Sequence, residues 1–413
     1  MAHVRVEGES KVSEEAVNGA KYVRQFFENA SNKTFMVERI IAQGSWGFTL
    51  QIMMRSNERP NMFSMSALGT ALGLQPLPSL YAPQPRPLAV SSNTTRFVLK
   101  RSLERVGENS IRREVDALDR LRGSMHIAQP SHIVDDPRWN TMMQSLEGPS
   151  LVMEWIENGL LWSFYERRAE VDEPLPNRLL WTLFLCLCRM VVALAWPPRD
   201  RGVTVRGGPE LEVIPPLDPR GERPPKSRLL HCDFHGQNIM IDQLEPKEHQ
   251  SVPMLKLIDF GMSRDQPQNI RNEPKELVSK TNIRAIGEVM LGLLRGNARG
   301  GPGMMDITYN EEMKRLMSYA TDLDRLSRKY GAPADLVAKH QDRINNLDPE
   351  IRNLVALCVA SKVEERPDIE DLLEIVERNA KNKREEDYIN YKYANNESDA
   401  AIRQIIDDHI FNA

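Results

Sequence analysis

The chain has 413 residues, of which 41% are hydrophobic and 27% are charged, and its formal net charge is −4. Fractions of this size are typical of a globular protein, and the length is sufficient for two lobes with separate cores. A net charge so close to zero gives no general attraction to nucleic acid or to an anionic membrane, so we expect neither as a partner.

The cysteines and the apolar segments bear on the compartment. None of the four cysteines falls into a metal-ligand or disulfide spacing, since Cys186 and Cys188 form a CxC on an apolar, helical stretch. Residues 1–10 are polar and carry charges of both signs, unlike a secretory leader. The longest apolar stretch, Leu179–Trp196, contains polar residues, which favours a core helix over a membrane span. We therefore expect reduced, buried thiols in a cytoplasmic or nuclear protein.

In chain order, residues 1–34 are predicted to form a helical extension, because Ser13–Ala30 places apolar side chains near one helical face. Strands follow, with a turn between the first two. Residues 56–94 are rich in Pro, Ser, Asn and Met, show no clear period, and are interpreted as a long insertion. The three predicted strands are Phe35–Ile41, Trp46–Met54 and Arg96–Arg101.

The middle of the chain contains two predicted helices and a strand between them. The first helix covers Asn109–Arg122, whose apolar residues recur on one face. The strand, Ser150–Ile156, is apolar, and the second helix, Pro176–Trp196, is predicted to be long and buried. Residues 197–228 are rich in Pro, Arg and Gly, and we expect a second insertion or a mobile loop there.

The C-terminal part is predicted to be helical almost throughout, from Lys280 to Ala380. Residues 381–413 form a charged and amphipathic tail, which either docks on its own domain or, like the insertions, binds a protein partner. The apolar residues of this tail are Ile402, Ile405, Ile406, Ile410 and Phe411. A strand-rich part, residues 35–156, followed by a helix-rich part, residues 157–380, predicts an α+β fold with segregated lobes.

One stretch near the middle of the chain is rich in residues that can do chemistry. Asp233 is followed five residues later by Asn238, and Asp259 begins an Asp-Phe-Gly triplet after a short apolar strand. Phosphoryl transfer needs a carboxylate beside the attacking hydroxyl, and it needs an amide oxygen and a second carboxylate as magnesium ligands. This pattern resembles the catalytic and metal-binding loops of the protein kinase-like superfamily, and the resemblance covers about residues 35–378.

The resemblance implies a bilobal fold, with a β-rich N-lobe and a mainly helical C-lobe. It also implies an ATP- and Mg²⁺-dependent phosphotransferase that transfers the γ-phosphate to a hydroxyl of a protein or a small molecule. In this family's terms Asp233 would accept or orient the hydroxyl proton, and Asn238 and Asp259 would bind the metal. His235 would assist phosphate charge or substrate orientation, or it would have a purely structural role.

Further residues are assigned to ATP by the same resemblance. Lys100 matches the strand lysine that binds the α- and β-phosphates, and Glu114 matches its ion-pair partner on the following helix. Residues 150–156 resemble the hinge strand, in which the backbone carbonyl of Glu154 and the amide of Ile156 would face adenine.

The turn between the first two predicted strands resembles the glycine-rich loop that covers ATP. Gly44 and Gly47 would let backbone amides approach phosphate oxygens without a Cβ in the way. Ala42 occupies the position where the family usually has its first glycine, so the motif is weaker here than in the family.

The residues that would contact the hydroxyl acceptor differ from those usual in the family. Cys232 replaces the arginine that commonly precedes the catalytic aspartate, which argues against regulation by a phosphorylated loop. His235 and Gly236 are closer to aminoglycoside and choline kinases, and the activation segment, residues 262–281, is short and has no Ala-Pro-Glu triplet. These departures leave two alternatives open: a pseudokinase scaffold or binding module, and an enzyme repurposed for nucleotidyl or acyl transfer.

Two positions in the C-terminal part match the family's helical lobe. Asn282 begins a stretch that resembles the start of the family's helix F. Arg366 matches the arginine that normally pairs with the glutamate of the missing triplet, and Glu273 and Glu276 are the candidates for its partner.

Overall fold

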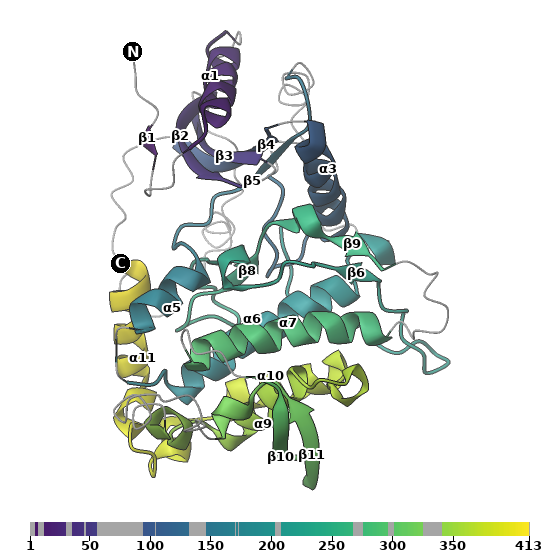
Figure 1. The fold of residues 1–413 in the computed structure, drawn as a ribbon, viewed down its shortest axis with the longest axis vertical. Coiled ribbons are helices and arrows are strands. Elements are labelled where there is room, and N and C mark those ends of the chain that lie inside the picture. The colour runs from purple at the N-terminus through teal and green to yellow at the C-terminus, as the bar shows by residue number, and fades with distance from the viewer. Residues whose placement is uncertain are drawn as a thin grey trace, which may run out of the picture. The chain divides into compact units, whose positions relative to one another are not determined.

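The computed structural model combines helices and strands, in agreement with the predicted α+β class (Figure 1). The chain divides into two compact units: unit 1 comprises Met1–Glu108 and Ser131–Trp155, and unit 2 comprises Asn109–Pro130 and Ile156–Ala413. Most of the first predicted insertion, residues 56–93, lies outside the described residues. The structure describes residues 5–6, 12–29, 35–44, 47–55, 94–103, 105–131, 146–169, 171, 173–202, 208–266, 276–295, 301–324 and 341–412.

Within the described residues, unit 1 is built on a five-stranded sheet in the order β1-β2-β3-β4-β5. β1 pairs parallel with β2, and the other neighbours pair antiparallel. Phe35 and Val37 of β2 are buried on one face, and a bulge after Val37 moves the next buried position to Ile40. The strands are β1 (Arg5–Val6), β2 (Phe35–Gln43), β3 (Gly47–Arg55), β4 (Thr94–Ser102) and β5 (Ser150–Glu154).

The predicted N-terminal helix is present as α1 (Glu14–Asn29), and it belongs to the core of unit 1. Its apolar residues recur every three or four positions and pack with buried residues of β2, β3 and β4. A Cβ at Gly19 would lie 2.7 Å from the Phe48 ring, so glycine lets α1 lie close to β3. The buried residues of α1 are Ala16, Ala20, Val23 and Phe27.

Helix α6 (Asn177–Ala195) is the central element of unit 2, and nearly all of its residues are buried. Helices α7 (Glu276–Arg295) and α10 (Ile369–Asn382) pack against it (Figure 1). The one charged group in its middle, Arg189, pairs with Glu248 at 2.7 Å, as a buried charge requires. By length and composition α6 is able to cross a membrane, with a mean hydropathy of 1.9, but 89% of this apolar window is buried inside the protein, as predicted for a core helix.

Other helices of unit 2 complete its framework. α9 begins with Pro349 at its first turn, and the side chain of Asp348 caps it by accepting the Glu350 amide at 2.9 Å. These helices are α3 (Arg105–Arg120), α5 (Leu161–Ala169), α9 (Pro349–Cys358) and α11 (Asp399–Ile406), of which α3 begins just before the boundary of unit 2.

The prediction that the C-terminal part is helical almost throughout is wrong over residues 303–318, which form a β-hairpin. β10 (Gly303–Tyr309) pairs antiparallel with β11 (Glu312–Ser318). Buried and exposed residues alternate along β10, which is a strand period. Asn310 and Glu311 both have positive φ, so they form a two-residue turn whose twist suits a hairpin.

Residues 208–228 form an irregular segment with a turn at Asp218–Glu222, and hydrogen bonds hold both of its ends to unit 2, whereas the predicted insertion or mobile loop stays a prediction. The amide of Glu210 donates to the carbonyl of Gly123 at 2.8 Å, which fixes the start of the segment to the turn after α3. Near its end, Nε1 of Trp196 donates to the carbonyl of Pro224 at 2.9 Å.

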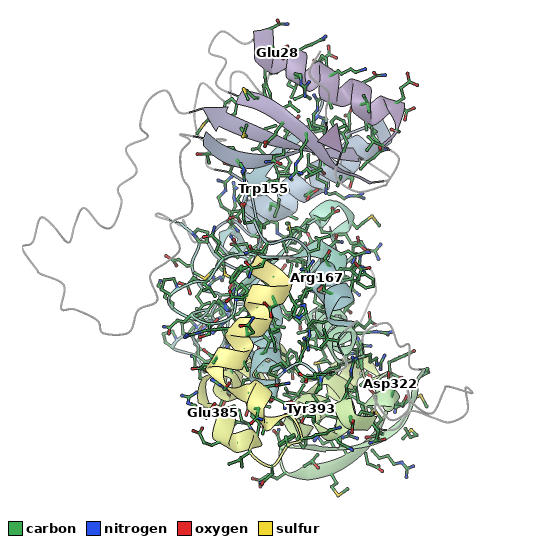
Figure 2. All side chains as sticks on the ribbon, turned by 90° about the vertical axis from the view of Figure 1, so that its left-hand side faces the viewer. Glu28, Trp155, Arg167, Asp322, Glu385 and Tyr393 are labelled. Carbon is green, nitrogen blue, oxygen red and sulfur yellow. The ribbon has the colours of Figure 1, made fainter. Side chains whose placement is uncertain are left out.

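The C-terminal tail docks on unit 2 itself, which is one of the two predicted alternatives. Arg167 of α5 donates from Nε to the carbonyl of His409 at 2.8 Å, and it lies beside the C-terminal helix in Figure 2. Phe411, by contrast, is 40% exposed. The buried apolar residues of the tail are Ile402, Ile406 and Ile410.

Candidate active site

The candidate residues of unit 2 lie on two loops that short strands bring together. The loop after β6 carries Asp233 and Asn238, and the loop after β8 carries Asp259. The amide of Ile258 donates to the carbonyl of Asn238 at 2.9 Å, so the two loops meet where the β7–β8 hairpin opens. The strand pairs are β6 (Leu229–Leu230) with β9 (Arg264–Asp265), and β7 (Ile239–Ile241) with β8 (Leu255–Leu257).

Asn238 holds Asp233 directly. Its Nδ2 donates to the backbone carbonyl of Asp233 and to Oδ2 of the same residue, at 2.8 Å in each case. Asn238 is buried, whereas the side chain of Asp233 remains 42% exposed. A buried amide therefore fixes a carboxylate that a ligand in solution can reach.

His235 holds the other oxygen of the same carboxylate. Its Nδ1 accepts the amide of Gln237 at 3.3 Å, which assigns the ring proton to Nε2. Nε2 then donates to Oδ1 of Asp233 at 3.1 Å. This contact orients the carboxylate of Asp233, and of the roles predicted for His235 it is closest to the structural one.

Asp259 has a backbone conformation that few residues adopt. Its φ is 61° and its ψ is 75°, in the left-handed region, which costs about 1 kcal/mol or more for a residue with a Cβ. Its Oδ1 accepts the amide of Gly261 at 3.3 Å, so the side chain caps the short turn that follows. Left-handed residues with a side chain are concentrated at functional sites.

His231 links the two loops through hydrogen bonds to their backbone. It was not among the predicted site residues. Its Nδ1 accepts the amide of Asp233 at 3.3 Å, and its Nε2 donates to the carbonyl of Ile258 at 3.0 Å. The ring packs edge-on against Phe260, with 4.7 Å between the ring centroids. Burial lowers the pKa of His231 to about 4, so the imidazole stays neutral and keeps both bonds.

Asn282 of α7 anchors the start of the first loop. Its Oδ1 accepts the amide of His231 at 3.4 Å, and its Nδ2 donates to the carbonyl of Leu229 at 3.0 Å.

Cys232, next in the loop, has a φ of 65° and is exposed, so the expectation of buried thiols is wrong for this cysteine. The other three cysteines, Cys186, Cys188 and Cys358, are free and buried as predicted.

Helix α3 holds the Asp-Phe-Gly turn through its backbone. Oε1 of the buried Glu114 accepts the amide of Phe260 at 3.3 Å. One turn earlier, Oγ of Ser110 donates to the carbonyl of Gly261 at 3.2 Å. The structure therefore brings Glu114 to the same loop as Asp259, and the predicted ion pair with Lys100 of unit 1 stays a prediction.

In unit 1, the sheet register brings the predicted phosphate-binding positions together. Thr49 of β3 lies opposite Ala42 of β2 and opposite Lys100 of β4, so the three residues form one row across the sheet. The amide of Gly44 donates to the carbonyl of Gly47 at 2.9 Å, which closes the turn between β2 and β3. Residues 45–46, at the tip of this turn, lie outside the described residues.

The predicted hinge residues lie at the end of β5. Glu154 is the last residue of this strand and pairs with Phe97 of β4. Ile156, two residues later, is buried and belongs to unit 2, where the amide of the nearby Asn158 donates to the carbonyl of Ile241 at 3.2 Å.

Arg366 is held by backbone carbonyls in the structure. Its Nε donates to the carbonyl of Ala360 at 3.1 Å and its Nη1 to that of Lys280 at 3.2 Å. Glu273, one of the two predicted partners, lies outside the described residues, and the side chain of Glu276 is not described either.

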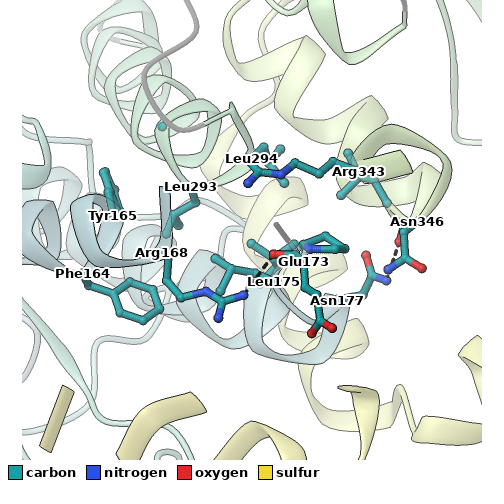
Figure 3. Close-up of a pocket in the computed structure, with 14 residues that line it drawn as sticks. Phe164, Tyr165, Arg168, Glu173, Leu175, Asn177, Leu293, Leu294, Arg343 and Asn346 are labelled. Atoms are coloured by element: carbon teal, nitrogen blue, oxygen red, sulfur yellow. Dashed lines mark hydrogen bonds between the residues drawn. The ribbon is translucent and has the colours of Figure 1, made fainter. Parts of the chain in front are cut away.

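A pocket elsewhere in unit 2 contains none of these residues. It is lined by side chains of α5, α6 and α7 and by residues 343–347 (Figure 3). Its two arginines, Arg168 and Arg343, donate to the carbonyls of Glu173 and Val171, at 3.0 Å each. They therefore fix the connection between α5 and α6.

No protein-family model matches this chain, and no curated protein matches it either. The resemblance to the kinase-like superfamily thus depends on the sequence motifs and stays a prediction. His231 was not predicted as a site residue, and Asn282 was predicted only as the start of a helix, because their spacing carries no chemistry by itself. The available signal for His231 was its position two residues before Asp233, where a buried ring can support the loop.

Proposed function

We propose that this protein is an ATP- and Mg²⁺-dependent phosphotransferase of the protein kinase-like superfamily, with unit 1 as its N-lobe and unit 2 as its C-lobe. The observation that carries the proposal is the linked pair of loops. Asp233 is held by Asn238, and the carbonyl of Asn238 is bonded to the residue before Asp259. Three residues of the types that the three roles require are therefore fixed on adjoining backbone.

The donor set at these loops fits magnesium. Nδ2 of Asn238 is used by Asp233, and no donor in the described part of the chain reaches its Oδ1. That oxygen and the carboxylate of Asp259 would hold the ion, since Mg²⁺ prefers oxygen ligands. When bound, Mg²⁺ would neutralise the charge that develops on the transferred phosphoryl group.

Asp233 would accept or orient the proton of the attacking hydroxyl. A proton acceptor must be oriented and must be reachable, and the carboxylate meets both needs, with a bond to each oxygen and 42% exposure. His235 would act on the acceptor hydroxyl only through this carboxylate, as a positioning residue. The acceptor itself would be a hydroxyl of a protein or of a small molecule.

The residues of unit 1 would bind the nucleotide. Lys100 would contact the α- and β-phosphates, and the turn of Gly44 and Gly47 would offer backbone amides to phosphate oxygens. The position of Ala42 and Lys100 in one row of the sheet supports this assignment. The backbone of Glu154 and Ile156 would pair with adenine.

The proposal is tested by thermal unfolding of the purified chain with ATP, with and without magnesium. We expect a magnesium-dependent rise of Tm in the wild type and its loss in Asp259→Asn. Asp306→Asn, an exposed residue of β10, is the control and should behave as wild type. Absence of a magnesium-dependent shift in the wild type would indicate a pseudokinase scaffold.

A labelling experiment separates phosphoryl transfer from nucleotidyl transfer. The chain is incubated with ATP labelled at the γ position or at the α position, with water and added cell extract as acceptors. Transfer of γ-label, reduced by Asp233→Asn, supports the phosphotransferase. Incorporation of α-label alone would show that the fold has been repurposed for nucleotidyl transfer.

A further inference from the structure

Four polar side chains from distant parts of the sequence meet inside unit 2, outside the candidate active site. His126 lies in the turn after α3, Cys186 lies on α6, and His249 lies in the connection between β7 and β8. Glu212 comes from the irregular segment 208–228. His126, Cys186 and His249 have no exposed surface, and Glu212 is 7% exposed.

Three of these residues offer metal-ligand atoms at coordination spacing. Nε2 of His126 is 3.0 Å from Nε2 of His249, and Sγ of Cys186 is 3.9 Å from Nε2 of His249. Ligands of one tetrahedral zinc ion lie about 3.3 Å apart for two nitrogens and about 3.6 Å for nitrogen and sulfur, given the usual bond lengths. All three ligand atoms lie within 4.8 Å of one another, so they are close enough to share one ion after small side-chain shifts.

Glu212 orients one of the imidazoles as metal sites require. Its Oε2 accepts from Nδ1 of His126 at 2.7 Å, and its Oε1 accepts the amide of the same residue at 2.7 Å. The proton of His126 is thereby held on Nδ1, and the lone pair of Nε2 points toward His249. A carboxylate behind a ligating histidine is the usual support of a zinc ligand.

A plain hydrogen-bond chain accounts less well for Cys186. Its Sγ is 3.8 Å from Nδ1 and 3.9 Å from Nε2 of His249, so it is directed to neither nitrogen.

We propose that His126, Cys186 and His249 bind one zinc ion. Two imidazoles and a thiolate form a donor set that zinc prefers over magnesium or calcium. Glu248, whose Oε2 lies 3.8 Å from Nε2 of His249, is held by Arg189 through both of its oxygens, so it is not counted among the ligands. The site is closed to solvent, which is typical of a structural ion.

The ion would brace the framework of the candidate active site. The carbonyl of His126 accepts the amide of Leu257, the last residue of β8 and two residues before Asp259. His249 lies in the connection of the same β7–β8 hairpin, whose other strand begins directly after Asn238. One ion would therefore join this hairpin to α6 and to the turn after α3.

Zinc content and zinc uptake of the full-length chain test the proposal. We expect about one zinc per chain after purification, loss of that zinc to a strong chelator with a fall in Tm, and recovery of both on adding zinc alone. Cys186→Ser should lose stoichiometric zinc and the Tm response to chelator. Cys188→Ser, a buried cysteine two residues along the same helix, is the matched control and should keep both.

Cobalt substitution of the wild type gives a readout that needs no variant to fold. Co²⁺ added to the chelated chain should produce a thiolate-to-cobalt absorption band and visible bands of tetrahedral cobalt. A chain that carries no zinc and takes up neither zinc nor cobalt overturns the proposal. Equal zinc binding by Cys186→Ser and wild type overturns it as well.

Discussion

Asn238 donates one amide nitrogen to both the backbone carbonyl and the carboxylate of Asp233, at 2.8 Å in each case. Asn238→Asp replaces this donor by a second carboxylate of nearly the same shape, so the two acidic groups repel each other. We expect the rate of γ-phosphate release from ATP to fall by roughly 100-fold or more, because the proton acceptor is no longer held in place. Initial rates with labelled ATP and saturating magnesium measure this.

The adjacent residue provides the control for that change. Gln237 is exposed, and it contributes its backbone amide to the loop. Gln237→Asp adds the same negative charge one residue away, and we expect less than a few-fold effect on the rate. If both variants lose the rate equally, charge in the loop is the cause and the bond between Asn238 and Asp233 is not.

His235→Ala tests whether this histidine acts by orienting Asp233. The variant removes the donor to Oδ1, and one lost hydrogen bond of about 1 kcal/mol predicts a fall in kcat of roughly five- to tenfold with little change in KM for ATP. His235 is 45% exposed, so Tm should hardly change. An unchanged kcat in His235→Ala would show that the histidine does not position Asp233. Its role would then be to accept the amide of Gln237 within the loop.

The elements with a strong periodic pattern were predictable from the sequence. α1 has apolar residues every three or four positions, and α6 is apolar on every side, so both were expected with nearly their observed bounds. The β10–β11 hairpin was not expected, because its turn, Asn310-Glu311, contains no glycine and the sequence on either side was predicted to be helical. A hairpin can be predicted from the local sequence only when its turn contains residues typical of hairpin turns.

The candidate site divides in the same way. Asp233, Asn238 and Asp259 were predicted because their spacing on one stretch resembles the loops of the protein kinase-like superfamily. His231 acts through contacts with Asp233 and Ile258, which the fold makes and which spacing does not reveal. The buried cluster of His126, Cys186, Glu212 and His249 comes from four segments, so no motif contains it.

The buried His231 predicts an acid-dependent loss of stability. Its pKa is about 4 in the folded protein and about 6.5 in an unfolded chain, so the unfolded chain binds the proton more tightly. The contribution of the neutral imidazole to the free energy of unfolding is fully present above pH 6.5. It is lost as the pH falls from 6.5 to 4, by an amount on the order of 3 kcal/mol. Urea unfolding at a series of pH values, without divalent ions, measures this slope.

The same series on His231→Gln isolates the contribution of the imidazole. Glutamine offers an amide donor but does not titrate, so we expect a lower stability at pH 7 and a shallower loss between pH 6.5 and 4. If the slope of this variant matches the wild type, other groups cause the acid sensitivity. The pKa of His231, followed by NMR of its ring protons in the native state, gives an independent check.

The close approach of Gly261 to Ser110 yields a prediction on stability that is independent of any activity. A Cβ at Gly261 would collide with Oγ of Ser110, whereas Cβ of Ser110 would be at an ordinary 3.7 Å. Gly261→Ala should therefore cost about 1–3 kcal/mol through overpacking. Ser110→Ala should cost about 1 kcal/mol, because it removes the donor to the carbonyl of Gly261.

The double variant decides whether α3 truly lies against this turn. Ser110→Ala removes the oxygen that the new methyl group meets, so the two changes together should cost clearly less than the sum of the single costs, with a coupling of about 1 kcal/mol or more. Ser279→Ala, a buried serine of α7, combined with Gly261→Ala serves as the control, and these two changes should add. Strict additivity of Ser110→Ala with Gly261→Ala in urea unfolding would place α3 away from the Asp-Phe-Gly turn, because side chains without contact do not couple.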